Sequence, residues 1–231
     1  MTVRPLVSVI LPVKNRARYV GEALASVVSQ DYRPIDVTVI DAASTDGTRD
    51  IALEFEKEGV RLVDQIGNGV ATAWNQGIDR SQGKFLAFIS SDDRWLPGKL
   101  SRQMTVMLDD PALMFTITSF RYFLQPDCAI PATFNRALLG RPLLGRIMET
   151  LVARREVFDS VGRFDAGFET AEDVDWYARA NDAGVPMRAL DDILLEKRIH
   201  DDNLSASGAQ NTPHLMEALH RSIRRRRGSG A

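Results

Sequence analysis

The pattern of apolar and polar positions predicts strands that alternate with helices over the first hundred residues. Short apolar, β-branched runs predict strands at 7–11, 36–40, 60–63 and 85–89. Apolar residues that recur three and four positions apart predict helices at 20–28, 51–58 and 70–80. Strands and helices that alternate at these lengths indicate an α/β fold, with a mostly parallel central sheet and helices on both faces.

The second half of the chain is less regular. We expect a helix at 99–108, a strand at 113–123 and an extended segment at 185–199. Further helices are predicted at 156–161, 170–183 and 214–227. Proline and glycine interrupt residues 125–146, and this segment receives no assignment.

Composition narrows the class of protein. The chain has 231 residues, of which 44% are hydrophobic and 26% charged, the size of one large or two small domains. Its one cysteine, Cys128, excludes an internal disulfide framework. The apolar runs are far shorter than the about 20 residues that cross a bilayer, and residues 1–5 do not resemble a signal peptide. We therefore expect a cytoplasmic protein.

Charge is distributed unevenly along the chain. The net charge is −2, yet residues 221–227 contain five arginines and no acidic residue. The rest of the chain is therefore acidic, which argues against a nucleic-acid groove as the main site. The basic end has two interpretations: a solvated tail, or a helix that rests on anionic lipid with Leu215, Leu219 and Ile223 on one face.

Polar clusters follow three of the predicted strands, at the edge where ligands collect in parallel sheets. Residues 12–15 follow the first strand, Asp41 the second, and Asp92 with Asp93 the fourth. Asp41 is either a turn residue or a hydrogen-bond acceptor for a base or ribose. Because residues 44–46 already supply caps for the next helix, Asp41 is expected to be free for a ligand.

Adjacent carboxylates at 92 and 93 repel each other unless a cation or hydrogen-bond donors neutralise them. Mg²⁺ and Mn²⁺ are commonly held by one or two carboxylates together with substrate phosphate oxygens. The two residues therefore indicate either a metal site or an ordinary surface loop.

Two further candidates lie in the second half. Thr170 and Asp173 have the spacing of a capping box, so Asp173 is either a helix cap or a general base at a helix start. Arg198 and His200 share one face of an extended segment, which suits an anion site as well as a structural role. The chain contains neither GxGxxG nor GxxxxGK[ST], so a metal on carboxylates is the expected partner of a bound phosphate.

Six short segments resemble, in the same order, the motifs of family-2 inverting glycosyltransferases of the GT-A fold. Residues 39–48, VIDAASTDGT, resemble the motif VDDGSTDGT, and residues 88–95, FISSDDRW, resemble the metal motif LDSDDxW. The other similar segments are 7–15, 73–83, 155–175 and 198–205. The chain departs from the motifs at Ala42 and Ser90, each of which replaces an aspartate.

The resemblance implies roles for particular residues. The residues that would hold the nucleotide are Pro12, Asn15, Asp41, Asn75 and Arg198. Asp92 and His200 would hold Mn²⁺ or Mg²⁺, with Asp93 as support. Asp173 would accept the proton of the acceptor hydroxyl. Whether Arg198 and His200 contact the diphosphate or complete the metal shell stays open.

The resemblance also implies an activity and a domain plan. The activity is metal-dependent transfer of a hexose, with inversion, from a nucleotide-diphosphate donor such as a UDP-sugar to a sugar or lipid-linked acceptor, as in cell-surface polysaccharide biosynthesis. A single GT-A domain would span 1–210, with a nucleotide half to about 110, an acceptor half after it, and a C-terminal helix and tail at 211–231. The alternatives are a nucleotidyltransferase and a catalytically silent sugar-nucleotide-binding protein. A peripheral contact with the inner face of the membrane through 221–227 also stays open.

Overall fold

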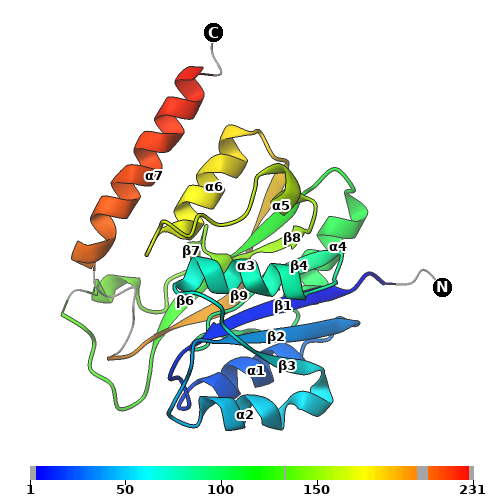
Figure 1. Cartoon of the computed structure of the whole chain (residues 1–231), viewed down its shortest axis with the longest axis vertical. Coiled ribbons are helices and arrows are strands. Elements are labelled where there is room, and N and C mark those ends of the chain that lie inside the picture. Colours follow the sequence, from blue (N-terminus) through cyan, green and yellow to red (C-terminus); the bar gives the residue numbers. More distant parts are fainter. Residues whose placement is uncertain (1–3, 133, 202–207, 229–231) are drawn as a thin grey trace.

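A computed structural model describes residues 4–132, 134–201 and 208–228. The chain forms a nine-stranded sheet with helices packed on both of its faces (Figure 1). The strands are β1 (Val7–Val13), β2 (Ile35–Asp41), β3 (Val60–Asp64), β4 (Phe85–Phe88), β5 (Arg94–Trp95), β6 (Phe115–Leu124), β7 (Leu143–Leu144), β8 (Val152–Arg154) and β9 (Met187–Ile199). Their order across the sheet is β3-β2-β1-β4-β8-β6-β9-β5, with β7 beside β6.

The first four strands are parallel, as the alternating pattern predicts. β1 pairs with both β2 and β4, and β2 pairs with β3. The connecting helices are α1 (Val20–Val28), α2 (Thr48–Glu54) and α3 (Val70–Arg80). The carboxyl ends of these strands therefore meet at one edge of the sheet, which brings the loops that follow β1, β2 and β4 together.

The second half adds antiparallel pairs to this sheet. β8 runs antiparallel to both β4 and β6, whereas β9 runs parallel to β6 along most of its length. Its helices are α4 (Lys99–Asp109), α5 (Val157–Ser160), α6 (Glu172–Asp182) and α7 (Gly208–Gly228). α7 lies along the outer side of α6 in Figure 1, and Pro213 falls within it.

The two faces of the sheet form two apolar cores. Val7, Val9 and Leu11 alternate along β1 toward the core that α1, α2 and α4 cover. Ile10 points to the opposite face, where α3, α5 and α6 bury an aromatic group around Phe88 and Trp176. Because helices cover both faces, the central strands are mostly apolar on both sides rather than strictly alternating, as expected for parallel strands.

Two glycines are required by close packing at this junction. A Cβ on Gly77 in α3 would lie 2.2 Å from Ile10 Cγ2, so only glycine lets α3 approach β1 this closely. A Cβ on Gly83 would lie 2.6 Å from the backbone nitrogen of Ser8. These two glycines are those of the 73–83 segment, which the structure explains as a packing motif.

Some predicted boundaries are wrong. The helix predicted over 51–58 ends at Glu54 and continues as a short 3₁₀ turn, η1 (Glu56–Glu58), before Gly59 in a left-handed conformation. The unassigned segment contains η2 (Arg136–Leu138) and β7, and η3 (Met148–Thr150) follows it. The division into halves at about residue 110 stays a prediction, and residues 202–205 of the last predicted motif lie outside the described residues.

Within the described part of the chain, none of the helices has the length and apolar character that crossing a membrane requires.

Candidate active site

The loops after β1 and β2 are joined by hydrogen bonds. The backbone N–H of Asn15 donates to Ser44 Oγ at 2.9 Å, and the N–H of Thr45 donates to Asn15 Oδ1 at 2.8 Å. Asn15 has a positive φ of 51°, a conformation that asparagine tolerates better than most residues. Pro12 lies opposite Ile40 in the register of β1 and β2. The structure thus brings Pro12, Asn15 and the end of β2 to one edge of the sheet.

Asp41, at the end of β2, is not free for a ligand, and this expectation is wrong. Its side chain is buried, and Oδ2 accepts hydrogen bonds from the backbone N–H of Ser44 at 3.1 Å and from Arg49 Nη1 at 2.6 Å. Arg49 also contacts Asp64 Oδ1 at 2.6 Å, from the end of β3. Asp41 therefore acts as a turn residue and pairs with Arg49. The half-exposed side chain of Arg49 is a polar group at this edge of the sheet that a ligand could reach.

Asp92 follows β4 and lies among cationic side chains. Its Oδ2 is 3.1 Å from His200 Nε2 and 3.9 Å from Arg16 Nε. Burial alone would raise the pKa of Asp92, but the hydrogen bond to His200 and the charges of Lys197 and Arg16 outweigh it and lower the pKa. Asp92 is therefore an ionised carboxylate, 17% exposed, with the predicted partner His200 beside it.

His200 is fully buried, and its ring lies against that of Tyr19, with centroids 4.6 Å apart. The nitrogen that faces Asp92 is either a donor to the carboxylate or a metal ligand beside it, depending on the tautomer. The tyrosine fixes the plane of the ring, so Asp92 and His200 form a preorganised pair.

Asp93 is buried, and its carboxylate accepts hydrogen bonds from a backbone N–H and from a lysine. Its Oδ1 accepts from the N–H of Arg198 at 2.9 Å, and its Oδ2 is 3.0 Å from Lys197 Nζ. Burial raises the pKa of Asp93 to about 7, helped by the charges of Asp92 and Glu149 and opposed by Lys197. Asp93 therefore links Lys197 to the backbone of Arg198, and its support of a metal ligand stays a prediction.

Sequence reasoning missed Lys197 and Glu149. Lys197 Nζ also lies 3.1 Å from Glu149 Oε1, and the same oxygen accepts a hydrogen bond from Ser90 Oγ. Glu149 lies in η3, directly after the segment that received no assignment. The sequence signal for Glu149 was Ser90. A serine in place of the aspartate of the motif indicates that a carboxylate from another segment lies beside this position.

Arg198 is buried among other side chains. Its guanidinium is 3% exposed and contacts the carboxylate of Glu22, the side chain of Gln125 and, at 2.7 Å, the backbone carbonyl of Asp92. It also lies over the ring of Phe123 at 4.6 Å. Arg198 thus positions the Asp92–Asp93 loop, and its contact with the diphosphate or the metal shell stays a prediction.

Asn75 has a structural task as well. Its side-chain amide donates to the carbonyl of Phe164 at 2.8 Å and accepts from the N–H of the same residue at 3.0 Å. This double hydrogen bond fastens α3 to the loop before α6. We therefore leave Asn75 out of the proposed nucleotide site.

Asp173 lies in the first turn of α6, but the predicted capping box is wrong. The N-cap is Ala171, with a positive φ of 64° and no side-chain cap. The carboxylate of Asp173 accepts from the neighbouring N–H of Val174 at 2.7 Å. Burial raises the pKa of Asp173 to about 6, with a further contribution from the charge of Glu149. A carboxyl group with this pKa can accept a proton near neutral pH.

Glu172 precedes Asp173 and is even harder to ionise. Burial, followed by the charge of Asp173, raises the pKa of Glu172 to about 8. The start of α6 thus combines two acidic residues whose pKa values are raised. Sequence reasoning considered Asp173 alone.

The residues fit a divalent cation of which most ligands are oxygens of the substrate and of water. Among the described residues there is no group of three or more His, Cys, Asp and Glu side chains that could hold a metal ion. Asp92 supplies one carboxylate and His200 one imidazole. Mg²⁺ and Mn²⁺ accept such a sparse protein set when diphosphate oxygens and water complete the shell.

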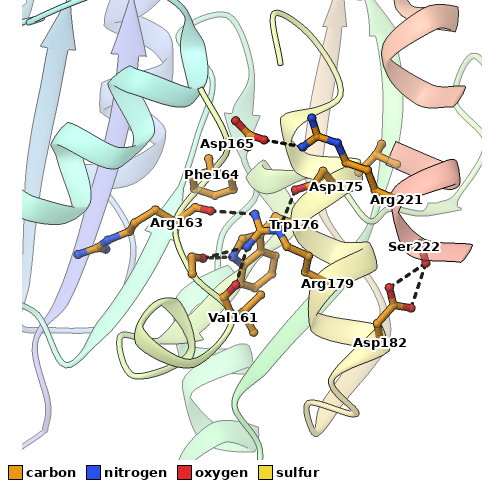
Figure 2. A network of polar contacts seen from close by, with 12 residues as sticks. Val161, Arg163, Phe164, Asp165, Asp175, Trp176, Arg179, Asp182, Arg221 and Ser222 are labelled. Carbon is orange, nitrogen blue, oxygen red and sulfur yellow. Dashed lines mark hydrogen bonds and ion pairs between the residues drawn. The ribbon is translucent and has the colours of Figure 1, made fainter. Parts of the chain in front are cut away.

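The basic C-terminal helix contacts α6 and the loop before it (Figure 2). Arg221 contacts Asp165 at 2.7 Å, and Ser222 donates to Asp182 at 2.8 Å. Arg225 and Arg226 also pair with Asp182, at 2.9 and 2.6 Å. Three of the five arginines therefore neutralise acidic residues of the protein itself. The exposed apolar residues of α7 are Leu215, Met216, Leu219 and Ile223.

Comparison with known proteins extends this picture. A family model described as glycosyl transferase family 2 matches residues 8–165. TuaG of Bacillus subtilis (strain 168), a glycosyltransferase named for teichuronic acid biosynthesis, is 36% identical over 125 residues, which cover 53% of this chain and 49% of TuaG. The Escherichia coli protein WfgD, named UDP-Glc:alpha-D-GlcNAc-diphosphoundecaprenol beta-1,3-glucosyltransferase, is 36% identical over 104 residues, 45% of this chain and 41% of WfgD. The chain thus spans about half or less of the length of these two relatives.

Solved structures share the fold. A fragment of S. aureus TarS in complex with UDP-GlcNAc superposes with a TM-score of 0.75 at 19% identity, covering 95% of this chain and 66% of that one. The mannosyltransferase PcManGT from Pyrobaculum calidifontis, in complex with GDP-Man and Mn²⁺, superposes with a TM-score of 0.74 at 22% identity, covering 96% and 65%. At these identities the likeness establishes the GT-A fold.

Proposed function

The chain belongs to glycosyl transferase family 2, and from this premise we propose that it transfers a sugar from a nucleotide-diphosphate donor to an acceptor hydroxyl, with inversion. The observation that carries the proposal is Asp92. It is an ionised carboxylate at the carboxyl end of β4, 3.1 Å from His200 and within reach of Arg16. This is the edge of a parallel sheet at which nucleotides bind.

We propose that the donor is a UDP-sugar. The nucleoside would lie between the loops after β1 and β2, against Pro12, Asn15 and the Asp41–Arg49 pair. Arg49 is held by two carboxylates, which restricts the movement of its guanidinium, and it would contact the base or ribose. The UDP-GlcNAc complex of the structural relative TarS supports this choice of nucleotide.

The diphosphate would lie over the turn at residues 90–92. Asp92 and His200 are the residues that would hold Mn²⁺ or Mg²⁺, and Mn²⁺ accompanies the nucleotide sugar in PcManGT. A bound divalent cation would offset the charge that develops on the leaving diphosphate. Arg16, whose Nε lies 3.9 Å from Asp92, would add a second positive charge at the same place.

Asp173 would act as the general base. Its pKa of about 6 leaves the carboxylate ionised at neutral pH, yet basic enough to accept the acceptor proton as the new bond forms. A base on the acceptor side and a leaving group on the opposite side of the sugar give a single in-line displacement. This geometry inverts the configuration at the reacting carbon.

We propose a sugar or lipid-linked acceptor in cell-surface polysaccharide biosynthesis. The name of WfgD includes a GlcNAc-diphosphoundecaprenol acceptor, and that of TuaG includes teichuronic acid. The exposed apolar residues of α7, with Arg224 and Arg227 beside them, would rest on anionic lipid and bring the site to such an acceptor.

The test is to incubate the protein with a panel of UDP- and GDP-sugars and Mn²⁺ and to measure hydrolysis as the release of the nucleoside diphosphate. Slow release from one donor, accelerated by an acceptor, supports a transferase. Nucleotide binding without turnover of any donor supports a silent binding protein instead. Release of pyrophosphate from a nucleoside triphosphate and a sugar phosphate would indicate a nucleotidyltransferase.

A further inference from the structure

Lys197 lies between two carboxylates beside the turn over which the proposed function places the diphosphate. Its Nζ is 3.0 Å from Asp93 Oδ2 and 3.1 Å from Glu149 Oε1. The side chains of these three residues are 16%, 1% and 9% exposed, so water screens the contacts weakly. The lysine comes from β9, the aspartate from the turn after β4 and the glutamate from η3. Three distant segments thus converge on one ammonium group.

Three carboxylates surround this one ammonium group. Asp92, Asp93 and Glu149 act on the same lysine, and together they raise the pKa of Lys197 well above its usual value despite its burial. Without the ammonium group, three carboxylates would share one small volume. Such a group either keeps protons or binds a cation.

Ser90 fits this arrangement. Its hydroxyl donates to Glu149 Oε1, the same oxygen that accepts from Lys197. An aspartate at position 90 would add a fourth carboxylate beside Glu149, which Lys197 alone would not neutralise. A serine supplies a hydrogen-bond donor there without adding charge.

We propose that Lys197 is a resident counter-cation of the diphosphate site, which occupies the place of a metal ion between Asp93 and Glu149 and leaves Asp92 with His200 to receive one. This inference rests on the proposed function. Its consequence is that the protein binds a divalent cation appreciably only together with a nucleoside diphosphate, because Lys197 occupies Asp93 and Glu149 and leaves only Asp92, with His200, to bind the cation.

The direct test is Mn²⁺ binding in the absence of nucleotide, measured by electron paramagnetic resonance. The variant Lys197→Met exposes Asp93 and Glu149 to the cation, so Mn²⁺ should bind roughly 10- to 100-fold more tightly than to the unmodified protein. Lys197→Arg keeps the charge and should bind Mn²⁺ as weakly as the unmodified protein. Equal Mn²⁺ affinity in Lys197→Met and the unmodified protein would overturn the inference.

A second variant keeps the test decisive if Lys197→Met does not fold. Glu149→Gln retains the shape of the side chain and its hydrogen bond with Ser90, but it leaves Lys197 with one carboxylate fewer. The metal-free affinity for UDP should rise about tenfold, because the ammonium group is then less neutralised. An unchanged affinity contradicts the inference.

Matched controls separate a local effect from a change in net charge. Lys57→Met and Glu58→Gln make the same substitutions at exposed positions in η1, far from the site, and should alter neither measurement. The failure of the proposed function is distinguishable: in that case the unmodified protein does not bind UDP at all, with or without Mn²⁺. If it binds UDP with Mn²⁺ but Lys197→Met gains no affinity for Mn²⁺ alone, the inference fails by itself.

Discussion

Asp92 and Asp93 lie among cationic side chains, whereas Glu172 and Asp173 contact no ion-pair partner within the described part of the chain. The hydrogen bond to His200 and the cations lower the pKa of Asp92. Burial raises the pKa of Glu172 to about 8 and of Asp173 to about 6, although Lys197 opposes both shifts. Asp92 and Asp173, one from each of two acidic dipeptides that look alike in the sequence, thus have pKa shifts of opposite sign, whereas the buried Asp93 has a pKa raised to about 7.

The difference assigns Asp92 and Asp173 different chemistry. A carboxylate that stays ionised among cations suits the binding of a metal and a diphosphate. A carboxylate whose pKa lies just below neutral suits the acceptance of a proton. Surroundings, rather than residue type, therefore separate the binding side of the site from its reacting side.

The largest expected effect is on the reacting side. Asp173→Asn should lower turnover by roughly 10²- to 10⁴-fold, the usual contribution of a general base. Because the pKa of Asp173 is raised, its ionised form destabilises the fold above about pH 6, so the variant should unfold at an unchanged or higher temperature. Initial rates and thermal unfolding check this, with the exposed Asp109→Asn as control. Full activity in Asp173→Asn would assign the base to another residue.

The pH profile sharpens the same assignment. Asp173 accepts a proton only when ionised, so turnover should fall below a pKa of about 6, approaching tenfold for each further pH unit. The residual rate of Asp173→Asn should lack this acidic limb. If the limb persists unchanged in that variant, another group controls it.

Two buried lysines offer the corresponding comparison for cations. Lys197 has carboxylate partners, whereas Lys99 donates to Gln103 Oε1 at 2.7 Å and lies over the ring of Trp95. Burial lowers the pKa of Lys99 from 10.5 to about 7, opposed by the charge of Glu149. The unfolded chain therefore binds this proton at a higher pH than the folded protein, and stability falls as the pH drops from about 10 to about 7.

Replacing Lys99 with methionine removes the loss of stability that comes from burying a charged amine. Lys99→Met should raise the free energy of unfolding by about 1–4 kcal/mol at pH 7, less whatever the lost hydrogen bond to Gln103 contributes. Urea unfolding at pH 7 and pH 9 measures the difference, which should shrink at the higher pH. A variant that is less stable at both values would show that the lysine is well accommodated when charged.

The smallest effect concerns α7. Arg221, Arg225 and Arg226 pair with acidic residues, so Arg224 and Arg227 are the arginines we expect to meet lipid, at about 1 kcal/mol each. The double variant Arg224→Gln/Arg227→Gln should co-sediment with acidic vesicles at low salt less than the unmodified protein does. A chain that ends at Ser222 should show the same loss. If all three proteins stay in the supernatant, the proposed membrane contact is wrong.

The parallel half of the fold could be predicted closely because its signals are local. The helix expected at 70–80 is α3 (Val70–Arg80), and the strand at 85–89 is β4 (Phe85–Phe88). Each strand there is a short apolar run, and each helix has its own apolar stripe. The pairing of β8 with both β4 and β6 depends on contacts between distant segments, which no local pattern reveals.

Individual residues of the candidate site could be predicted from the sequence, but most of the contacts between them could not. Asp92 and His200 were expected together, and they lie 3.1 Å apart. Arg198 was expected to face the ligand but is enclosed by Glu22 and Gln125, which are far from it in sequence. Glu149 and Lys197 were missed because a carboxylate and a lysine acquire their roles here only through tertiary contact.

The most direct test of the contrast between the two acidic pairs is calorimetric titration of UDP, with and without Mn²⁺, into Asp92→Asn and Asp173→Asn. In the unmodified protein and in Asp173→Asn, Mn²⁺ should tighten UDP binding by at least about tenfold. In Asp92→Asn, Mn²⁺ should give no such gain. A metal-dependent gain that survives in Asp92→Asn, or disappears in Asp173→Asn, would contradict the division of the site into a binding side and a reacting side.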